Sequence, residues 1–517
     1  MRKPIVIVIG LTLFVVASIT HADVQPADIF GDRMVLQREA PVPVWGRADP
    51  GEAVTVSFRG QTVKTTADDT GAWRVTLPES KAGGPFELTI QGNDTVTFTD
   101  VLVGDVWLCS GQSNMAFPLK WCDGWRERES KDVDHPRIRL VTIGNRPSLE
   151  PMSRIANGAK WLASDTESAD GFSGVGYVFG RAIHKSQNVP VGLIGAYQGA
   201  TPVEAWTSGK TVEAEPEYKP ILERWERYVA NYPEAMKRYE KKLAQWEPKA
   251  AEARAAGKRP PRKPRRPKGP MDNNRPAVLY NARIAPIAPY AIRGVIWYQG
   301  ERNSGRAAQY RELFPNLIRD WCARWGQGEF PFLFVQLAVV GRRARQPGDS
   351  AWGELREAQA LARSLPNTAM VCSYDTAATG NIHPKNKRPV GERLARAARA
   401  IVYGEDVAYR GPQFRKMTVR DGEAVLTFDH VGKGLVVKGD ALEGFAVASA
   451  DKTFHWAEAR IEGNKVVVSA EAVTEPAAVR YAWANNPPGN LVNKEGLPAE
   501  PFRTDEWRLT TEGRVHP

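Results

Sequence analysis

The spacing of apolar residues changes twice along the 517-residue chain, and these changes constrain its fold. Between residues 23 and 100, short runs alternate apolar and polar residues and are separated by Pro-Gly, Asp-Asp-Thr-Gly and Gly-Gly turns. A period of two is typical of half-buried strands in antiparallel sheets, so this segment is predicted to form a β-sandwich. The clearest runs are residues 53–58, 72–77 and 86–90.

From Val101 to about Tyr403, compact apolar runs alternate with helical patterns. This alternation is typical of a parallel sheet covered by helices on both faces. In one of the helical patterns, residues 310–325, apolar residues recur at steps of three and four. The predicted strands are residues 103–109, 138–143, 191–197, 292–298, 332–339 and 368–373.

After Arg410 the period returns to that of strands, at residues 424–428, 434–437, 465–469 and 478–483. The chain is also longer than a single core usually holds. We therefore predict an α/β fold class, with a three-layer α/β/α domain flanked by β-sandwich domains. The expected boundaries are 23–100 for the N-terminal β-sandwich, 101–410 for the α/β domain and 411–517 for the C-terminal β-domain.

The first 22 residues resemble a secretory signal peptide. Arg2 and Lys3 precede an apolar stretch at residues 5–19, and Thr20-His21-Ala22 offers small residues at the cleavage position. We expect cleavage after Ala22 and an exported protein, periplasmic or secreted, without a membrane contact once the signal is removed. An uncleaved anchor is the alternative, although the apolar stretch is short for a membrane span.

The net charge of +11 comes from one segment. Residues 237–268 hold 13 Lys or Arg residues against three Glu, which leaves the rest of the chain close to neutral. The segment is rich in Pro and has no aromatic residue after Trp246, so it lacks stacking platforms for bases and no nucleic-acid partner is expected. We predict a solvated insertion at about 215–270, beginning with an exposed helix or helical hairpin; contact with an anion or a cell surface is the alternative.

Cysteine and histidine usage argues against a metal or disulfide scaffold. Cys109, Cys322 and Cys372 lie within apolar patterns and are expected to be buried, and Cys122 leaves open a disulfide with Cys109 in an oxidising compartment. The seven histidines are scattered without metal-ligand spacing. We therefore expect no metal and no cofactor.

The run Val106-Trp-Leu-Cys-Ser-Gly-Gln-Ser-Asn-Met115 is the strongest chemical signal. An apolar strand leads directly into Ser113, Gly111 allows the backbone to turn, and amide side chains flank the hydroxyl. Far downstream, His383 precedes a predicted helix and is the best candidate for a base. A serine hydroxyl needs such a base to attack a carbonyl, so the pair predicts a serine hydrolase acting as an esterase. Taken alone, the tetrapeptide is more often a polar turn.

Five segments in order resemble bacterial sialate O-acetylesterases of the SGNH hydrolase superfamily, from about Asp23 to the end of the chain. They are FGDRMVL (30–36), VGDVWLCSGQSNM (103–115), WYQGERN (297–303), IHPKNK (382–387) and AWANNPPGNLVNKEGLPAEPF (482–502). The resemblance implies a flavodoxin-like SGNH domain and a carbohydrate O-acetylesterase. It also implies an oxyanion hole made of the backbone N–H groups of Ser113 and Gly199 and an amide of Gln299 or Asn303. Gln299 is favoured because it lies at a strand end.

The chain departs from the family pattern at the position of the carboxylate that orients the histidine. Related esterases place an Asp shortly before the histidine, where this chain has Gly380 and Asn381. Asp375 is the nearest upstream carboxylate and is the predicted third member of a triad. If Asp375 does not reach His383, a backbone carbonyl takes its place and the site is a Ser-His dyad.

The expected partner is an acetylated carbohydrate, either a 9-O-acetylated sialic acid or an acetylated plant polysaccharide such as xylan. Asn114, Glu301 and Trp206 are candidate substrate contacts, although a buried structural role is also expected for Glu301. The indole rings of Trp121, Trp125, Trp206 and Trp297 offer flat faces to sugar rings. A non-catalytic carbohydrate-binding protein is the alternative from another class, and the sequence does not indicate an oligomeric state.

Overall fold

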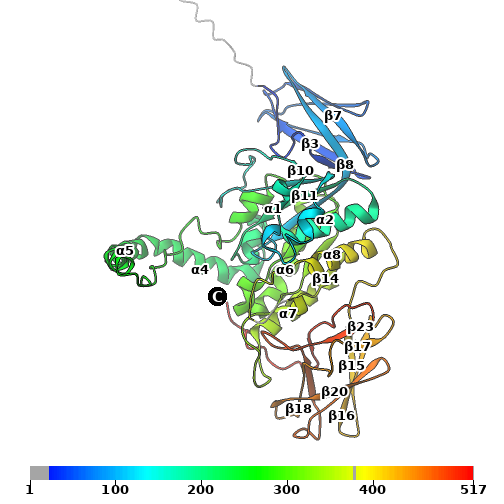
Figure 1. The fold of residues 1–517 in the computed structure, drawn as a ribbon. Coiled ribbons are helices and arrows are strands. Elements are labelled where there is room, and N and C mark those ends of the chain that lie inside the picture. Colours follow the sequence, from blue (N-terminus) through cyan, green and yellow to red (C-terminus); the bar gives the residue numbers. More distant parts are fainter. Residues whose placement is uncertain (1–22, 377–379, 516–517) are drawn as a thin grey trace, which may run out of the picture.

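The structure is a computed structural model that describes residues 23–376 and 380–515. The predicted signal peptide, residues 1–22, lies outside the described residues. The chain forms three parts stacked end to end: a β-rich N-terminal part, a central α/β part and a β-rich C-terminal part (Figure 1). In the described part of the chain, no helix combines the length and the apolar character needed to cross a bilayer.

The N-terminal part consists of short, mostly antiparallel strands whose alternate side chains are buried. One small sheet has the order β1-β3-β6, and the remaining strands pair with one another and with the first half of β8. The strands are β1 (Gln25–Pro26), β2 (Val35–Gln37), β3 (Val42–Arg47), β4 (Ala53–Phe58), β5 (Gln61–Thr66), β6 (Ala72–Leu77) and β7 (Gly83–Gln91).

Strand β8 (Thr95–Gly111) belongs to two parts of the molecule at once. Its first half pairs antiparallel with β7, and its second half pairs in parallel with two strands of the central sheet. The expected boundary at residues 100 and 101 falls inside this strand. The two parts are therefore joined by a continuous hydrogen-bonded strand and not by a linker.

The central sheet has the order β10-β9-β11-β8-β12-β13-β14, in which every pair except β10 with β9 is parallel. This parallel sheet confirms the predicted α/β fold class. The chain builds the sheet to one side of β8 and then crosses over to the other side, which creates a switch point at the carboxyl end of β8. The strands are β9 (His135–Thr142), β10 (Leu162–Ser164), β11 (Val191–Tyr197), β12 (Gly294–Tyr298), β13 (Phe332–Val335) and β14 (Thr368–Val371).

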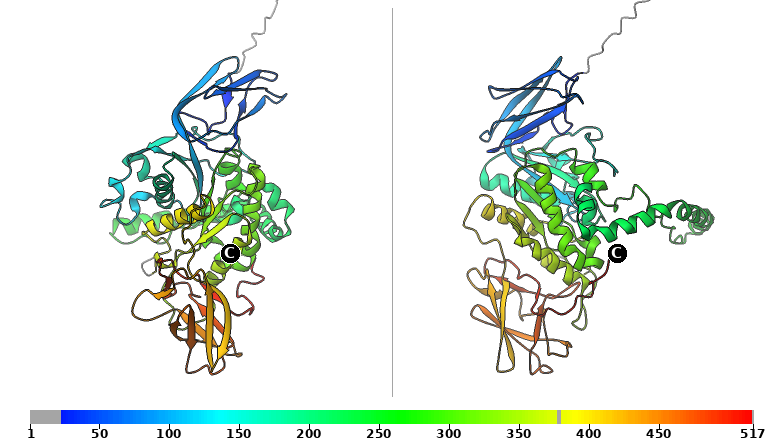
Figure 2. Two further views of the ribbon diagram at one scale, coloured as in Figure 1. Left: turned by 90° about the vertical axis from the view of Figure 1, so that its right-hand side faces the viewer. Right: turned by 180° about the vertical axis from the view of Figure 1, so that it is seen from behind.

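Helices cover both faces of this sheet, as Figure 2 shows from two sides. Trp107 of β8 packs edge-on against Phe179 of α2, whereas Trp297 of β12 packs against Trp321 of α6. The β8–β12 register places the two tryptophans on opposite faces. The helices are α1 (Thr166–Asp170), α2 (Gly174–Gln187), α3 (Gly209–Ala214), α6 (Ala307–Trp325), α7 (Ala351–Leu361) and α8 (Arg388–Ile401).

Short helical turns lie in the connections between these elements. His383 precedes a helix, as the sequence predicts, and α8 begins at Arg388 after Pro384 and a short loop. The turns are η1 (Leu119–Trp121), η2 (Glu129–Lys131), η3 (Val203–Trp206), η4 (Pro216–Tyr218), η5 (Tyr280–Ile284), η6 (Glu301–Arg306), η7 (Ala362–Ser364) and η8 (Tyr374–Thr376).

The predicted insertion projects from the α/β part as a helical arm (Figure 1). Helix α4 (Lys219–Ala230) leads outward, and α5 (Tyr232–Ala255) continues from it after Asn231. Residues 256–270 then return toward the body without helix or strand.

The C-terminal part is a β-domain with its own hydrophobic core. Its two four-stranded sheets have the orders β15-β16-β21-β20 and β19-β18-β22-β24, with the pair β17-β23 beside them. The strands are β15 (Gln413–Arg420), β16 (Glu423–Asp429), β17 (Leu435–Val437), β18 (Phe445–Ala448), β19 (Phe454–Trp456), β20 (Glu458–Glu462), β21 (Lys465–Ser469), β22 (Ala478–Tyr481), β23 (Leu491–Asn493) and β24 (Phe502–Arg503).

All four cysteines are free thiols, so the disulfide left open between Cys109 and Cys122 is absent from the described residues. Cys109 and Cys372 are buried as expected, whereas Cys322 is partly exposed. Burial raises the pKa of the Cys122 thiol to about 12, which keeps this thiol protonated and unreactive at neutral pH.

Candidate active site

The site forms where β8, β11 and β12 end, at the switch point of the central sheet. Gly111 closes β8 with φ of 133°, and a Cβ atom there would lie 2.2 Å from the Tyr298 carbonyl oxygen. Only glycine fits this close approach between β8 and β12. The backbone N–H of Gln112 then donates to the same Tyr298 oxygen over 2.9 Å, which fixes the turn that presents Ser113.

Ser113 and His383 meet as the sequence predicts. The Oγ of Ser113 lies 2.8 Å from Nε2 of His383. The backbone N–H of His383 donates to Oδ1 of Asn381 over 2.9 Å, and the Phe117 ring stacks beside the imidazole at 6.5 Å. Burial, and then the charge of Lys387, lower the pKa of His383, so its imidazole is neutral and able to accept a proton near pH 7.

Gly199 lies directly opposite the nucleophile. It follows β11, and a Cβ atom on it would lie 3.5 Å from the Cβ of Ser113. The backbone N–H groups of Ser113 and Gly199 find no acceptor within the described residues. Two unpaired donors beside a nucleophile are the arrangement that holds an oxyanion.

The side-chain amides of Gln299 and Asn303 are not available as oxyanion donors. Gln299 Nε2 donates to the Thr201 carbonyl oxygen over 3.2 Å and to Asn303 Oδ1 over 2.7 Å, while Asn303 Nδ2 donates to Glu204 over 3.0 Å. Gln299 and Asn303 are fully buried, so their amides connect the loops after β11 and β12 beneath the site. Both residues thus lie at the site, where their hydrogen bonds hold the neighbouring loops in place.

The Asn114 amide connects three of the sequence motifs. Its Nδ2 donates to Glu301 Oε1 over 2.5 Å and to the Ile382 carbonyl oxygen over 3.0 Å, and its Oδ1 accepts from Lys387 Nζ. Asn114 is fully buried and both of its donors are used. Asn114 therefore positions the loops that carry Ser113 and His383 and does not reach a sugar.

Glu301 and Lys387 lie on either side of Asn114, and each is hydrogen-bonded to its amide. Glu301 Oε2 is buried without a hydrogen-bond partner within the described residues, and burial raises the pKa of this carboxyl. The Lys387 ammonium lies 4.9 Å from the centre of the Phe117 ring, and burial lowers its pKa to about 8. Lys387 was not among the predicted site residues, although it is the last residue of the IHPKNK segment.

Asp375 is not joined to His383 in the described part of the chain. Its two carboxylate oxygens accept from Arg393 of α8 over 2.7 and 2.6 Å. Arg393 also donates to the Cys372 carbonyl oxygen over 2.8 Å, so the ion pair fastens α8 to the end of β14. This geometry favours the dyad form of the site over the Ser-His-Asp triad.

Only one of the four proposed sugar-stacking tryptophans is exposed. Trp206 and Trp297 are fully buried and contact each other edge-on, so the expectation that Trp206 binds substrate is wrong. Trp125 is 8% exposed, whereas Trp121 is 59% exposed. The Trp121 ring lies 5.9 Å from Phe117, the ring that stacks on His383.

A serine paired with a neutral histidine, facing two free backbone N–H groups at the switch point of a parallel sheet, is the arrangement of the serine hydrolase class. Among the described residues, no group of three His, Cys, Asp or Glu side chains is placed to hold a metal ion.

The comparisons with known proteins agree with this class. Residues 103–241 and 274–400 match the family described as SASA, carbohydrate esterase, sialic acid-specific acetylesterase. The chain is 29% identical to the sialate O-acetylesterase of Homo sapiens over 513 residues, covering 89% of this chain and 88% of that protein. The Mus musculus sialate O-acetylesterase is 28% identical over 536 residues, covering 93% and 94%. A crystal structure of a carbohydrate acetylesterase from Xanthomonas citri shares 36% identity at a TM-score of 0.79, covering 94% of this chain and 100% of that chain.

The chain belongs to the sialic acid-specific acetylesterase family of carbohydrate esterases. The predicted carbohydrate O-acetylesterase is thereby confirmed at the level of the family, and with it the prediction of an ester hydrolase.

Replacing Lys387 by Met tests the buried charge. The ammonium lowers the pKa of His383, so its removal raises that pKa and moves the acidic limb of the kcat/KM profile to higher pH. Because Asn114 also loses a donor, kcat falls by about tenfold to a hundredfold. The measurement is a pH–rate profile on a small acetate ester, with Lys385→Met, an exposed lysine two residues away, as the control. An acidic limb that stays in place would show that Lys387 does not act on His383.

Replacing Asp375 by Asn separates the dyad from the triad. If the carboxylate serves only Arg393, the variant loses about 3 kcal/mol of unfolding free energy, because a partly buried cation is left unpaired. At temperatures well below its melting temperature, the variant then keeps the kcat of the wild type. Arg393→Met should destabilise to a similar extent. Urea unfolding and kcat are measured on both variants. A folded Asp375→Asn enzyme with a kcat lowered by three or more orders of magnitude would establish the triad.

Proposed function

We propose that this esterase removes acetyl groups from sugar hydroxyls, with Ser113 as nucleophile and His383 as general base. The observation that supports the proposal most directly is the 2.8 Å contact between Ser113 Oγ and His383 Nε2. The lowered pKa of His383 adds to it, because a base must be unprotonated at the pH of the reaction.

In the first step, Ser113 Oγ attacks the acetyl carbonyl carbon while His383 Nε2 takes the hydroxyl proton. The negative charge that develops on the carbonyl oxygen is held by the backbone N–H groups of Ser113 and Gly199. The C–O bond to the sugar then breaks, and His383 returns the proton to the sugar oxygen. An acetyl-serine remains.

In the second step, a water molecule gives a proton to His383 and attacks the acetyl-serine. The bond to Ser113 Oγ breaks, His383 protonates that oxygen, and acetic acid leaves and gives its proton to solvent. Every atom and proton in this cycle comes from the ester, from water and from these two side chains. The cycle therefore calls for no metal and no cofactor.

The substrate is an acetylated carbohydrate, and we place O-acetylated sialic acid first among the candidates. The curated relatives from Homo sapiens and Mus musculus are named sialate O-acetylesterases, and the Xanthomonas citri structure is titled a carbohydrate acetylesterase. Trp121 offers an exposed ring near His383 on which a sugar can stack. Export through residues 1–22 belongs to the same proposal, since glycans of this kind lie outside the cytoplasm.

Acetate release from a panel of O-acetylated sugars tests the substrate class. The panel contains 9-O-acetylated sialic acid, acetylated xylan and a chromogenic acetate ester. A kcat/KM for the sialic acid ester at least about tenfold above that for xylan supports the assignment. The reverse order would make the protein a polysaccharide deacetylase, and release from neither sugar would leave only the general esterase.

Ser113→Ala should lower kcat by several orders of magnitude, and His383→Ala by a comparable factor, because the two residues act as a unit. Both side chains lie at the surface of the site, so the melting temperature should change little. The control is Ser304→Ala, which removes a partly exposed hydroxyl that donates to the Glu301 carbonyl oxygen over 3.0 Å. Retention of half the activity in Ser113→Ala would remove this serine from the mechanism.

Trp121→Ala tests the stacking platform. The variant should raise KM for an acetylated sugar by about tenfold and leave kcat on a chromogenic acetate ester within about twofold, because only the sugar uses the ring. Trp456→Ala, which truncates an exposed tryptophan in the C-terminal β-domain, is the matched control. Equal effects on both substrates would assign Trp121 to the structure of the site and not to sugar binding.

A further inference from the structure

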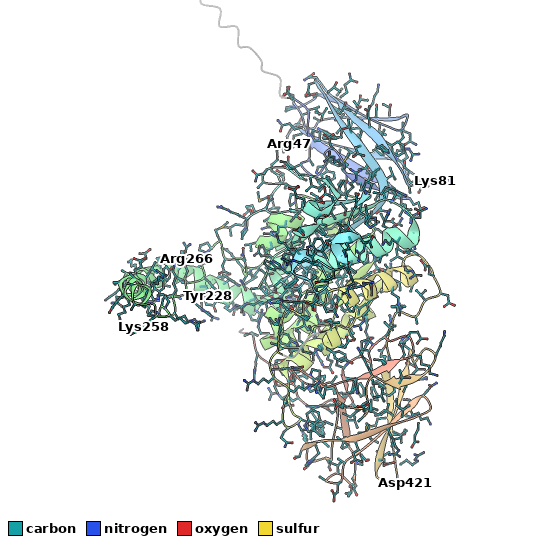
Figure 3. The ribbon with its side chains drawn as sticks, in the orientation of Figure 1. Arg47, Lys81, Tyr228, Lys258, Arg266 and Asp421 are labelled. Carbon is teal, nitrogen blue, oxygen red and sulfur yellow. The ribbon has the colours of Figure 1, made fainter. Side chains whose placement is uncertain are left out.

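The basic arm, defined as residues 232–268, is an ordered hairpin and not a loose tail. Helix α5 has 24 residues and is therefore about 36 Å long. The returning segment is fastened to it, because Trp246 Nε1 donates to the Pro261 carbonyl oxygen over 2.8 Å and Arg266 donates to Tyr232 Oη over 3.2 Å. Figure 3 shows the arm extending from the body with Lys258 and Arg266 on it.

The cations of the basic arm are displayed to solvent with little acid to neutralise them. Twelve of its 13 Lys and Arg residues are exposed, and only Lys268 at the base is partly covered. The ion pair found in the arm is that of Lys237 with Glu234, at 2.9 Å. A dense surface charge of one sign, held on an extended element, attracts a polymer of the opposite sign.

Most of the basic arm lies outside the segments that the chain shares with its family. The match to the family covers residues 103–241 and resumes at residue 274, so most of the arm and its return lie outside the matched segments. The arm therefore supplies a surface that the family's shared esterase fold does not need.

The base of the basic arm adjoins the site. Lys268 lies 5.5 Å from the ring centre of Trp225 in α4. A few residues further on, Asn274 Oδ1 accepts from Arg302 Nε over 2.9 Å, and Arg302 follows Glu301 in the loop after β12. The returning end of the arm thus leads to a segment bonded to a loop of the candidate active site, so a polymer bound along the arm would lie on the same side as that loop.

The side chains of the basic arm indicate which kind of anionic partner it can bind. None of its large apolar side chains is exposed, so the arm has nothing to insert into a lipid bilayer. The Trp246 ring already contacts two cations of the arm, Arg254 at 5.8 Å and Lys263 at 5.5 Å from its centre, which compete with a nucleic-acid base for the ring. What remains is recognition by charge alone, which suits a flexible chain of carboxylates.

We propose that the basic arm binds acidic polysaccharide and, given the proposed function, holds an acetylated acidic polysaccharide beside the active site. Binding relies on exposed ammonium and guanidinium groups facing carboxylates. It is therefore weakened by salt, since the screening length falls to about 8 Å at physiological ionic strength.

The test uses the full-length protein and fluorescein-labelled polygalacturonate, a polymer of carboxylates, with Kd read by fluorescence anisotropy at low and physiological salt. The arm variant replaces four exposed cations whose side chains make no hydrogen bond, ion pair or ring contact among the described residues. They are Lys258→Gln, Arg259→Gln, Arg262→Gln and Arg265→Gln. The control variant removes the same number of exposed lysines from the C-terminal β-domain. They are Lys416→Gln, Lys433→Gln, Lys465→Gln and Lys494→Gln.

We expect the arm variant to raise Kd by at least about tenfold and to flatten its salt dependence, while the control changes Kd by less than about twofold. On acetylated polygalacturonate the arm variant should raise KM and keep kcat, with turnover of a chromogenic acetate ester reporting an intact site. Equal losses in both variants, or no binding by the wild type, would overturn the proposal. Tighter binding to single-stranded RNA or to anionic phospholipid vesicles would overturn it in favour of those partners.

The two proposals fail in different ways. A wild type that binds polygalacturonate through the arm but releases no acetate from any ester contradicts the proposed function and leaves arm binding standing. An active esterase whose Kd for polygalacturonate is the same with and without the four arm cations contradicts only the arm.

Discussion

The active site depends on the hydrogen bonds of one buried amide. Asn114 sits next to the nucleophile in the chain, donates to the carbonyl oxygen of Ile382 beside the base, and contacts Glu301 and Lys387 from two further segments. These groups come from the loops that follow β8, β12 and β14, of which β8 and β12 are neighbours in the sheet and β14 lies at its edge. Because a buried amide is costly to leave unpaired, its bonds allow a single arrangement of the loops, and the distance between Ser113 and His383 follows from it.

Local patterns were sufficient to predict most of the strands. The bounds of β4, β6 and β11 agree with the predicted runs, since alternation and compact apolar runs are properties of neighbouring residues. Ser113 and His383 were singled out because an apolar strand leads into the serine and because both residues lie in segments that resemble the family. The resemblance of five ordered segments added the family, which the comparisons confirmed.

The predictions that were wrong, or that the geometry disfavours, concern partners distant in the sequence. Asp375 is followed by Arg393 eighteen residues later, and only the packing of α8 against β14 shows that this arginine takes both carboxylate oxygens. Gln299 lies at the strand end where an oxyanion donor is expected, but its side-chain amide already donates to Thr201 and Asn303. Trp206 carries no sequence signal that separates a buried indole from an exposed one.

Strand β8 has a mechanical consequence. Its first half is paired within the N-terminal β-sheet and its last residue precedes the loop that carries Ser113, so one unbroken run of backbone passes from that sheet to Ser113. Pulling the N-terminal sheet apart shears the same strand that anchors the site. We therefore expect the N-terminal sheet and the site to unfold together, since one hydrophobic core contains buried residues of both parts.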